Sequence, residues 1–176
     1  MSSIVSGAAA SRQYCRNVPI TVEAVYEERY WYPEEGGQVW LAGYQLVEAG
    51  SGRYLARDAP ELARLGLRVA GVAGASRHHG DALASEAIAP GDPLELRRDA
   101  GNEHDPNAIA VHVRGGKQLG WVPRELAADI APQIDAGRTW SALVLREQRA
   151  SPRDPLSGLT MLLAPDAELQ LRAAAP

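Results

Sequence analysis

Residues 102–111, with the sequence NEHDPNAIAV, combine titratable side chains with the signals of a tight turn. His104 and Asp105 could bind a ligand, exchange a proton or accept a hydrogen bond from a hydroxyl group. Asp105, Pro106 and Asn107 also suit a β-turn, because proline fixes φ and an aspartate side chain bonds back to the backbone. The residue types alone leave both interpretations open, a structural turn and a binding site.

A predicted hairpin links this turn to a second group of polar and aromatic residues. The segments AIAVHV and KQLGWV alternate apolar residues as strands do, and RGG between them supplies the glycine that hairpin turns require. Residues 102–105 precede the hairpin, whereas Trp121 and Arg124 lie at and beyond its end. Antiparallel strands bring their outer ends together, so we expect both groups at one rim of a sheet.

The remaining periodicity predicts a mainly β protein of the α+β type. Alternating or continuous apolar runs predict further strands over residues 67–72, 93–99, 139–148 and 159–164. Many short strands with one or two helices are typical of a small OB-like or SH3-like β-barrel.

Two helices are predicted beside these strands. Pro123 opens a helix whose apolar residues recur four apart and which ends before Gly137, and Pro132 is expected to kink or divide it. Residues 58–66 predict a shorter helix, with Asp58 as its N-cap.

We divide the chain into three parts: a β-rich N-terminal extension of unassigned function over residues 1–66, a barrel over 67–149, and a C-terminal strand and tail over 150–176. Residues 1–17 are small and polar and are expected to fray, and several short strands should follow them. The consecutive aromatic residues 30–32 cannot all face one core, because side chains alternate along a strand. At least one is therefore exposed or covered by a partner.

Composition argues against several classes of protein. The 18 basic and 22 acidic residues give a net charge of −4, unlike a protein that covers duplex DNA regardless of sequence. Cys15 is the only cysteine, so the chain forms no internal disulfide and no multi-cysteine zinc cage. No apolar run spans a bilayer and no signal peptide is recognisable, so we expect a cytoplasmic protein without a membrane partner.

The sequence carries no recognisable catalytic motif, and we predict neither enzymatic activity nor a cofactor. HExxH and G-x-S-x-G are absent, and EAGSGRYL lacks the lysine and hydroxyl residue of a phosphate-binding loop. One alternative is a metal-dependent hydrolase acting on nucleic acids or acid anhydrides, with zinc held by His78, His79, His104 and Asp105. Another is a non-enzymatic module that binds a protein partner through the barrel or the aromatic stretch YWYPEEGG.

The segments GNEHDPNAIAV and LGWVPRELAADIAPQIDAG resemble the HIRAN domain, which is found fused to helicase-like DNA repair ATPases and alone in bacterial proteins. The resemblance is to the stand-alone type and runs from about Leu67 to Arg149. It implies an OB-like or SH3-like barrel that binds DNA, in eukaryotic helicase-fused members by taking a 3′ single-strand end into a pocket. Single-stranded DNA or its 3′ ends would be the partner, in repair or processing alongside a separate helicase or nuclease.

Carried over residue by residue, the resemblance places Asn102, His104 and Asp105 in the pocket for the DNA end. Asp105 would accept a hydrogen bond from the terminal hydroxyl. Trp121 falls at a DNA-contacting position, and Arg124 falls where a basic residue meets phosphate.

One segment departs from the eukaryotic pattern. After VAG that pattern has an arginine and adjacent tyrosines, whereas VAGASRHHGD offers Arg77, His78 and His79 several residues later. We include Arg77 and His78 among the predicted nucleic-acid-binding residues.

Each of these residues also has a structural alternative. Trp121 could fill the barrel core, Arg124 could pair with Glu125 or Asp129 on the helix surface, and His78 could lie in a solvated loop. The choices between DNA and RNA, between ends and internal strands, and between a monomer and an oligomer stay open.

Overall fold

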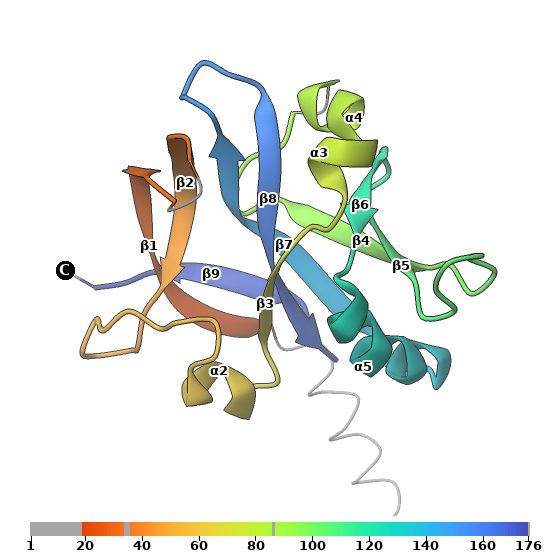
Figure 1. Cartoon of the computed structure of the whole chain (residues 1–176). Coiled ribbons are helices and arrows are strands. Elements are labelled where there is room, and N and C mark those ends of the chain that lie inside the picture. The colour runs from red at the N-terminus through yellow and green to blue at the C-terminus, as the bar shows by residue number, and fades with distance from the viewer. Residues whose placement is uncertain (1–18, 34–35, 86, 176) are drawn as a thin grey trace, which may run out of the picture.

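The structure is a computed structural model that describes residues 19–33, 36–85 and 87–175 (Figure 1). The side chains of Ser76 and Arg77 lie outside this description, as does the prediction made for residues 1–17. The elements are β1 (Ile20–Trp31), β2 (Val39–Leu46), α2 (Pro60–Arg64), β3 (Arg68–Gly71), α3 (Ala75–His78), α4 (Gly80–Ser85), β4 (Pro93–Arg98), β5 (Ile109–Val113), β6 (Gln118–Trp121), α5 (Arg124–Asp135), β7 (Trp140–Arg149), β8 (Leu156–Pro165) and β9 (Leu169–Ala173).

Six of the strands close into a small barrel in the order β3, β8, β7, β4, β5 and β6, each antiparallel to the next. The ring is completed beyond the end of β3, where the Ala73 amide donates to the Trp121 carbonyl at 2.8 Å and the Trp121 amide donates to the Ala73 carbonyl at 2.9 Å. The prediction of a mainly β fold with an OB-like barrel is confirmed.

Two hydrophobic cores lie on opposite faces of β7 and β8, because successive side chains of a strand point to opposite faces. Val144 and Leu163 belong to the core inside the barrel. Leu145 and Leu162 belong to a second core, which β1, β2 and α2 complete from the outside. The barrel therefore takes in β8, beyond residue 149, and the N-terminal segment packs on the outer face of two barrel strands.

The N-terminal segment forms two long strands where several short ones were predicted. β1 pairs with β2 from Ala24 to Trp31 and with β9 only from Ile20 to Ala24. Past Ala24 the strand lies largely outside the second core, so polar and aromatic residues alternate without a simple apolar period. The expectation that at least one of the consecutive aromatics is exposed is confirmed, since Tyr30, Trp31 and Tyr32 are all exposed.

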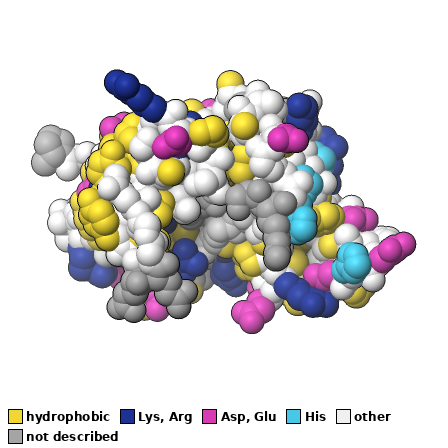
Figure 2. All heavy atoms as spheres, turned by 45° about the horizontal axis from the view of Figure 1, so that its top comes forward, with side chains coloured by type: hydrophobic (Ala, Val, Ile, Leu, Met, Phe, Trp, Pro, Cys, Tyr) yellow, Lys and Arg dark blue, Asp and Glu magenta, His cyan; other side chains and the backbone are white. Residues whose placement is uncertain are grey.

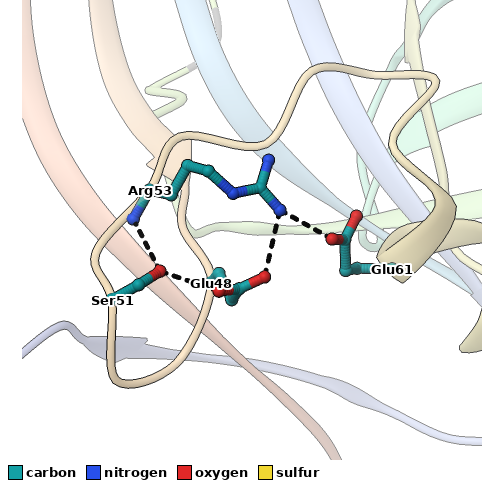
Figure 3. Close-up of polar contacts among 4 residues, drawn as sticks. All are labelled: Glu48, Ser51, Arg53 and Glu61. Carbon is teal, nitrogen blue, oxygen red and sulfur yellow. Dashed lines mark hydrogen bonds and ion pairs between the residues drawn. The ribbon is translucent and has the colours of Figure 1, made fainter.

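A cluster of four polar residues ties the loop after β2 to α2 (Figure 3). Arg53 Nη2 donates to Glu48 at 3.0 Å and to Glu61 at 2.6 Å, and the Ser51 hydroxyl donates to Glu48 at 2.8 Å. The Ser51 hydrogen bond and then Arg53 hold the pKa of Glu48 below its usual value. This cluster lies on the extension and not on the barrel.

The helices differ from prediction in three details. Ala59 occupies the N-cap position of α2 without a side-chain cap, so Asp58 is not the cap. The helix α5 continues through Pro132, so it is not divided there; the carbonyl that loses its helical donor belongs to Ala128, which lies on the exposed side of the helix. His78 lies at the end of a short helix, not in a loop. No helix in the described ranges is long and apolar enough to cross a membrane.

Candidate nucleic-acid interface

A pocket of about 260 Å³ opens at the seam where the barrel closes. Ala73 and Trp121, the two residues that bond across the seam, lie on its wall. The loop before β5 and the start of α5 supply the remainder. The complete lining is Ala73, Asn102, His104, Asp105, Ala108, Trp121, Val122 and Arg124.

The two carboxylate oxygens of Asp105 have different surroundings. Oδ1 accepts a hydrogen bond from the Asn107 amide at 2.9 Å, and the Asp105 carbonyl accepts one from the Ala108 amide at 3.1 Å, which together form the predicted turn. Oδ2 lies 3.9 Å from Arg124 Nε, and both side chains line the pocket. Asp105 therefore forms the turn with one oxygen and presents the other to the pocket.

Asn102 holds the loop that carries the pocket residues. Its Oδ1 accepts hydrogen bonds from the backbone amides of His104 at 2.9 Å and Asp105 at 3.0 Å, and its Nδ2 donates to Asp99 at 3.0 Å. Most of the bonding capacity of this amide is thus used within the loop. Asn102 lines the pocket, but its hydrogen bonds orient His104 and Asp105.

Arg98, which the sequence patterns did not indicate, holds the same loop through hydrogen bonds to its backbone. Its guanidinium donates to both Asp135 oxygens at 2.9 and 3.0 Å, to the Ala108 carbonyl at 2.8 Å and to the Pro106 carbonyl at 3.0 Å. The paired Asp135 raises the pKa of Arg98, and Arg98 lowers the pKa of Asp135. This side chain, 14% exposed, joins the turn to the end of α5.

The position of Arg98 in its strand is the one sequence feature that could have indicated its structural role. It follows Leu94 and Leu96 at a spacing of two, so it lies on the face of β4 that Leu94 turns to the core. A charged residue at such a position needs partners. Those partners are distant in sequence or are backbone carbonyls, and periodicity does not reveal either.

Arg98→Ala is expected to lower the free energy of unfolding by about 2 kcal/mol, because the Asp135 carboxylate and the Pro106 and Ala108 carbonyls each lose hydrogen bonds from this side chain. The amides of Asn107 and Ala108 should also exchange faster with solvent, since their turn loses its support. Chemical denaturation and hydrogen exchange measure the two effects. Arg97→Ala is the matched control, because Glu95 at the surface is the one ion-pair partner of Arg97 within the described part of the chain. An equal loss in both variants would contradict this role for Arg98.

Arg124 lies at the first position of α5 and leans across the pocket toward the loop. Its guanidinium donates one hydrogen bond to the His104 carbonyl at 3.3 Å and reaches Asp105 at 3.9 Å. It pairs with neither Glu125 nor Asp129, the two partners considered from sequence. With 77% of its side chain exposed and only these long contacts, Arg124 can turn toward an anion.

Trp121 is neither fully in the core nor fully exposed. Leu119, two residues earlier, is completely buried, whereas the Trp121 ring borders the pocket. The rings of Trp121 and His78 both lie near Gly74: a Cβ added there would stand 3.3 Å from His78 Cδ2 and 3.7 Å from Trp121 Cδ1. Exposed His78 therefore lies beside the tryptophan, just outside the pocket.

The histidines do not gather into a metal-binding group. Among the described residues, no three His, Cys, Asp or Glu side chains come together in a way that could hold a metal ion. Burial, followed by the nearby His78 and His112, lowers the pKa of His79. His79 is therefore expected to be mostly neutral at pH 7, because its unperturbed pKa is about 6.5.

Of the seven residues predicted to bind nucleic acid, five line this one pocket and His78 lies next to it. The seventh, Arg77, is in α3, and its side chain lies outside the described part. Figure 2 shows histidine side chains on the same side of the molecule as the barrel strands β5 and β6 of Figure 1.

The closed ring of six short strands is a barrel of the OB-like class. The HIRAN domain family matches residues 66–155, just over half of the chain, and the chain belongs to this family. HIRAN domains are binding domains that bind DNA.

Two solved structures are similar to the chain. The crystal structure of the HIRAN domain of human HLTF is 23% identical with a TM-score of 0.41, over 56% of this chain and 75% of that chain. A crystal structure of a protein from Lactobacillus plantarum is 22% identical with a TM-score of 0.41, over 55% of this chain and 91% of that chain. No curated protein matches the chain significantly.

Proposed function

We propose that the pocket at the barrel seam binds the 3′ end of single-stranded DNA. The observation that carries this proposal is that one pocket is lined by three groups: the Asp105 oxygen that does not bond to the turn, the guanidinium of Arg124 and the ring of Trp121. A terminal nucleotide offers the matching chemistry, with a hydroxyl donor, a phosphate and a base.

Each group has one task in this proposal. Asp105 Oδ2 accepts a hydrogen bond from the terminal hydroxyl, while Oδ1 keeps the turn in place. Trp121 stacks on the terminal base, and such stacking contributes about 1 to 3 kcal/mol per base. Arg124 contacts the phosphate that links the last two nucleotides, and His78 offers a second ring beside Trp121 for the next base.

The net charge and the size of the pocket set the affinity we expect. One arginine gives a small number of phosphate contacts, and the chain as a whole carries a net charge of −4. Binding should therefore be weak, short in footprint and only moderately dependent on salt. A protein of this kind suits a role in DNA repair or processing beside a separate helicase or nuclease.

The end preference tests the proposal directly. A 3′ phosphate would bring a second anion to Asp105, and like charges about 4 Å apart in water repel by roughly 1 kcal/mol. Unmutated protein should therefore bind a hydroxyl end on the order of fivefold more tightly than a phosphate end. Fluorescence anisotropy with short labelled single strands measures both affinities.

Asp105→Asn should abolish this preference. Asparagine keeps an oxygen for the Asn107 amide, so the turn is retained while the negative charge is removed. Arg124→Ala is the matched comparison: it should weaken binding of both ends alike and reduce the salt slope by about 0.7, the value of one single-strand phosphate contact. An unchanged preference in Asp105→Asn would exclude this carboxylate from the site.

We also propose that the chain has no catalytic activity. The pocket combines no nucleophile with a base, and His104 and Asp105 meet no further metal ligand among the described residues. Purified protein should cleave neither the hydroxyl-ended nor the phosphate-ended DNA strand, with or without zinc. Turnover that His104→Ala abolishes would favour the metal-dependent hydrolase instead.

A further inference from the structure

The outer edge of β1 is only partly covered. β9 pairs with β1 from Ile20 to Ala24 and ends there, so Val25–Trp31 have a strand partner on one side only, among the described residues. Figure 1 shows this upper part of β1 beside β2 at the margin of the molecule, with β9 beside the lower part. A strand edge of this kind is a template for pairing with another chain.

The hydrogen bonds of β1 identify which backbone groups point outward. On the β9 side, the Ile20 amide donates to the Glu168 carbonyl just before β9, and the Ala24 carbonyl accepts from the Ala174 amide just after it. On the opposite side, the Glu23 carbonyl accepts from the Val47 amide, which directly follows β2. Backbone groups alternate between the two edges of a strand, so even-numbered residues face outward.

Three outward-facing residues lie on the uncovered part, Tyr26, Glu28 and Tyr30. Each presents one N–H and one C=O to the free edge, and no described strand pairs with them there. Glu28 is the midpoint of Val25–Trp31. A two-fold axis through Glu28 would therefore match the whole uncovered segment to its own copy, with six backbone hydrogen bonds.

The side chains at this register are complementary on both faces of the sheet. On one face, Glu27 of each copy stands directly opposite Arg29 of the other, in the closely spaced type of antiparallel pair. No ion pair within the described residues includes Arg29. The other copy would thus give this arginine a carboxylate partner, and the two-fold symmetry produces two such Glu27–Arg29 pairs.

Aromatic residues line the other face. Tyr26 packs edge-on against Tyr44 of β2 with ring centres 5.5 Å apart, and Tyr30 packs against Trp40 at 5.0 Å. At the Glu28-centred register Tyr26 meets Tyr30 of the other copy, so each of these pairs continues into a row of four rings. Figure 2 shows hydrophobic side chains gathered along this flank of the molecule, over β1 and β2.

We propose that two copies of this chain pair antiparallel through the free edge of β1, with Glu28 at the two-fold axis. The sheet then continues from one copy into the other, and the two barrels lie at its outer sides. This dimer does not depend on DNA binding. Its one unfavourable contact is the pair of Glu28 carboxylates at the axis.

A charge-swap cycle tests the interface. Arg29→Glu places like charges opposite each other twice and should weaken the dimer on the order of tenfold, and Glu27→Arg should do the same. The double variant Glu27→Arg/Arg29→Glu restores both attractive pairs and should recover the dimer. Sedimentation equilibrium of the full chain over a range of concentrations measures each dissociation constant.

Glu28→Gln is expected to strengthen the dimer, whereas the single charge reversals weaken it. It removes the repulsion at the axis while keeping an oxygen for the Tyr26 hydroxyl, which donates to Glu28 at 3.2 Å. This variant should dimerise more tightly than the unmutated chain. Circular dichroism checks that every variant is folded, which matters for Glu27→Arg because Glu27 accepts a hydrogen bond from Tyr54.

The outcomes separate cleanly. A concentration-dependent dimer that both single reversals weaken, the double variant restores and Glu28→Gln strengthens supports the proposal. An unmutated chain that stays monomeric at submillimolar concentration overturns it. A dimer that neither single reversal weakens forms through a different surface and overturns it as well.

Discussion

Gly120→Ala is expected to lower the free energy of unfolding by about 3 kcal/mol, at the upper end of what overpacking costs. A Cβ at this position would stand 2.4 Å from the Ala73 carbonyl oxygen and 2.7 Å from Val72 Cγ1. The obstacle is mostly backbone, so a rotamer change cannot relieve it. Because Ala73 and Trp121 close the barrel beside this glycine, the variant should open the seam and distort the pocket as well.

Gly158→Ala is the control for this effect. Gly158 lies in β8, another barrel strand, and an added Cβ would meet only the Gln148 side chain at 3.7 Å, an ordinary contact. Thermal and denaturant unfolding should therefore separate the two variants clearly. Equal stability of Gly120→Ala and the unmutated protein would mean that β6 and the segment just after β3 do not approach each other this closely.

Trp121→Ala is expected to weaken single-strand binding between about 5-fold and 150-fold. This range corresponds to the loss of one stacked base, about 1 to 3 kcal/mol. Trp121→Phe keeps an aromatic face and should retain part of the affinity. Anisotropy titrations at constant salt measure both variants.

Tyr32→Ala controls for a general loss of aromatic surface, because Tyr32 is the most exposed aromatic residue described and follows β1, away from the pocket. It should bind DNA as the unmutated protein does. If Trp121→Ala binds DNA normally while remaining folded, the ring has a packing role only.

Much of the candidate site could be predicted because its signals are local. The turn at Asp105 depends on three consecutive residues, and the hairpin that leads to Trp121 depends on alternation and glycine. These two features were sufficient to place both groups at one rim. The sequence could not show that Asp105 divides its oxygens between the turn and the pocket, since this depends on where Arg124 lies.

The missed features depend on contacts between residues far apart in the chain. Arg98 reaches Asp135 and two carbonyls, and barrel closure depends on a single bridge from Ala73 to Trp121. Neither leaves a periodic pattern. The length of β1 was missed for a related reason, since its second half lies largely outside the core and a burial pattern cannot mark it.

Whether the pocket takes a strand end is measured by comparing the affinities of a linear single strand bearing a 3′ hydroxyl and a covalently closed circle of the same sequence. Both strands offer the same bases and phosphates, but only the linear strand has an end that can enter the pocket beside Asp105. We expect clearly tighter binding of the linear strand by the unmutated protein, and loss of that difference in Asp105→Asn. Equal affinity for the circle and the linear strand would contradict this expectation and would leave a barrel that binds internal single-stranded segments.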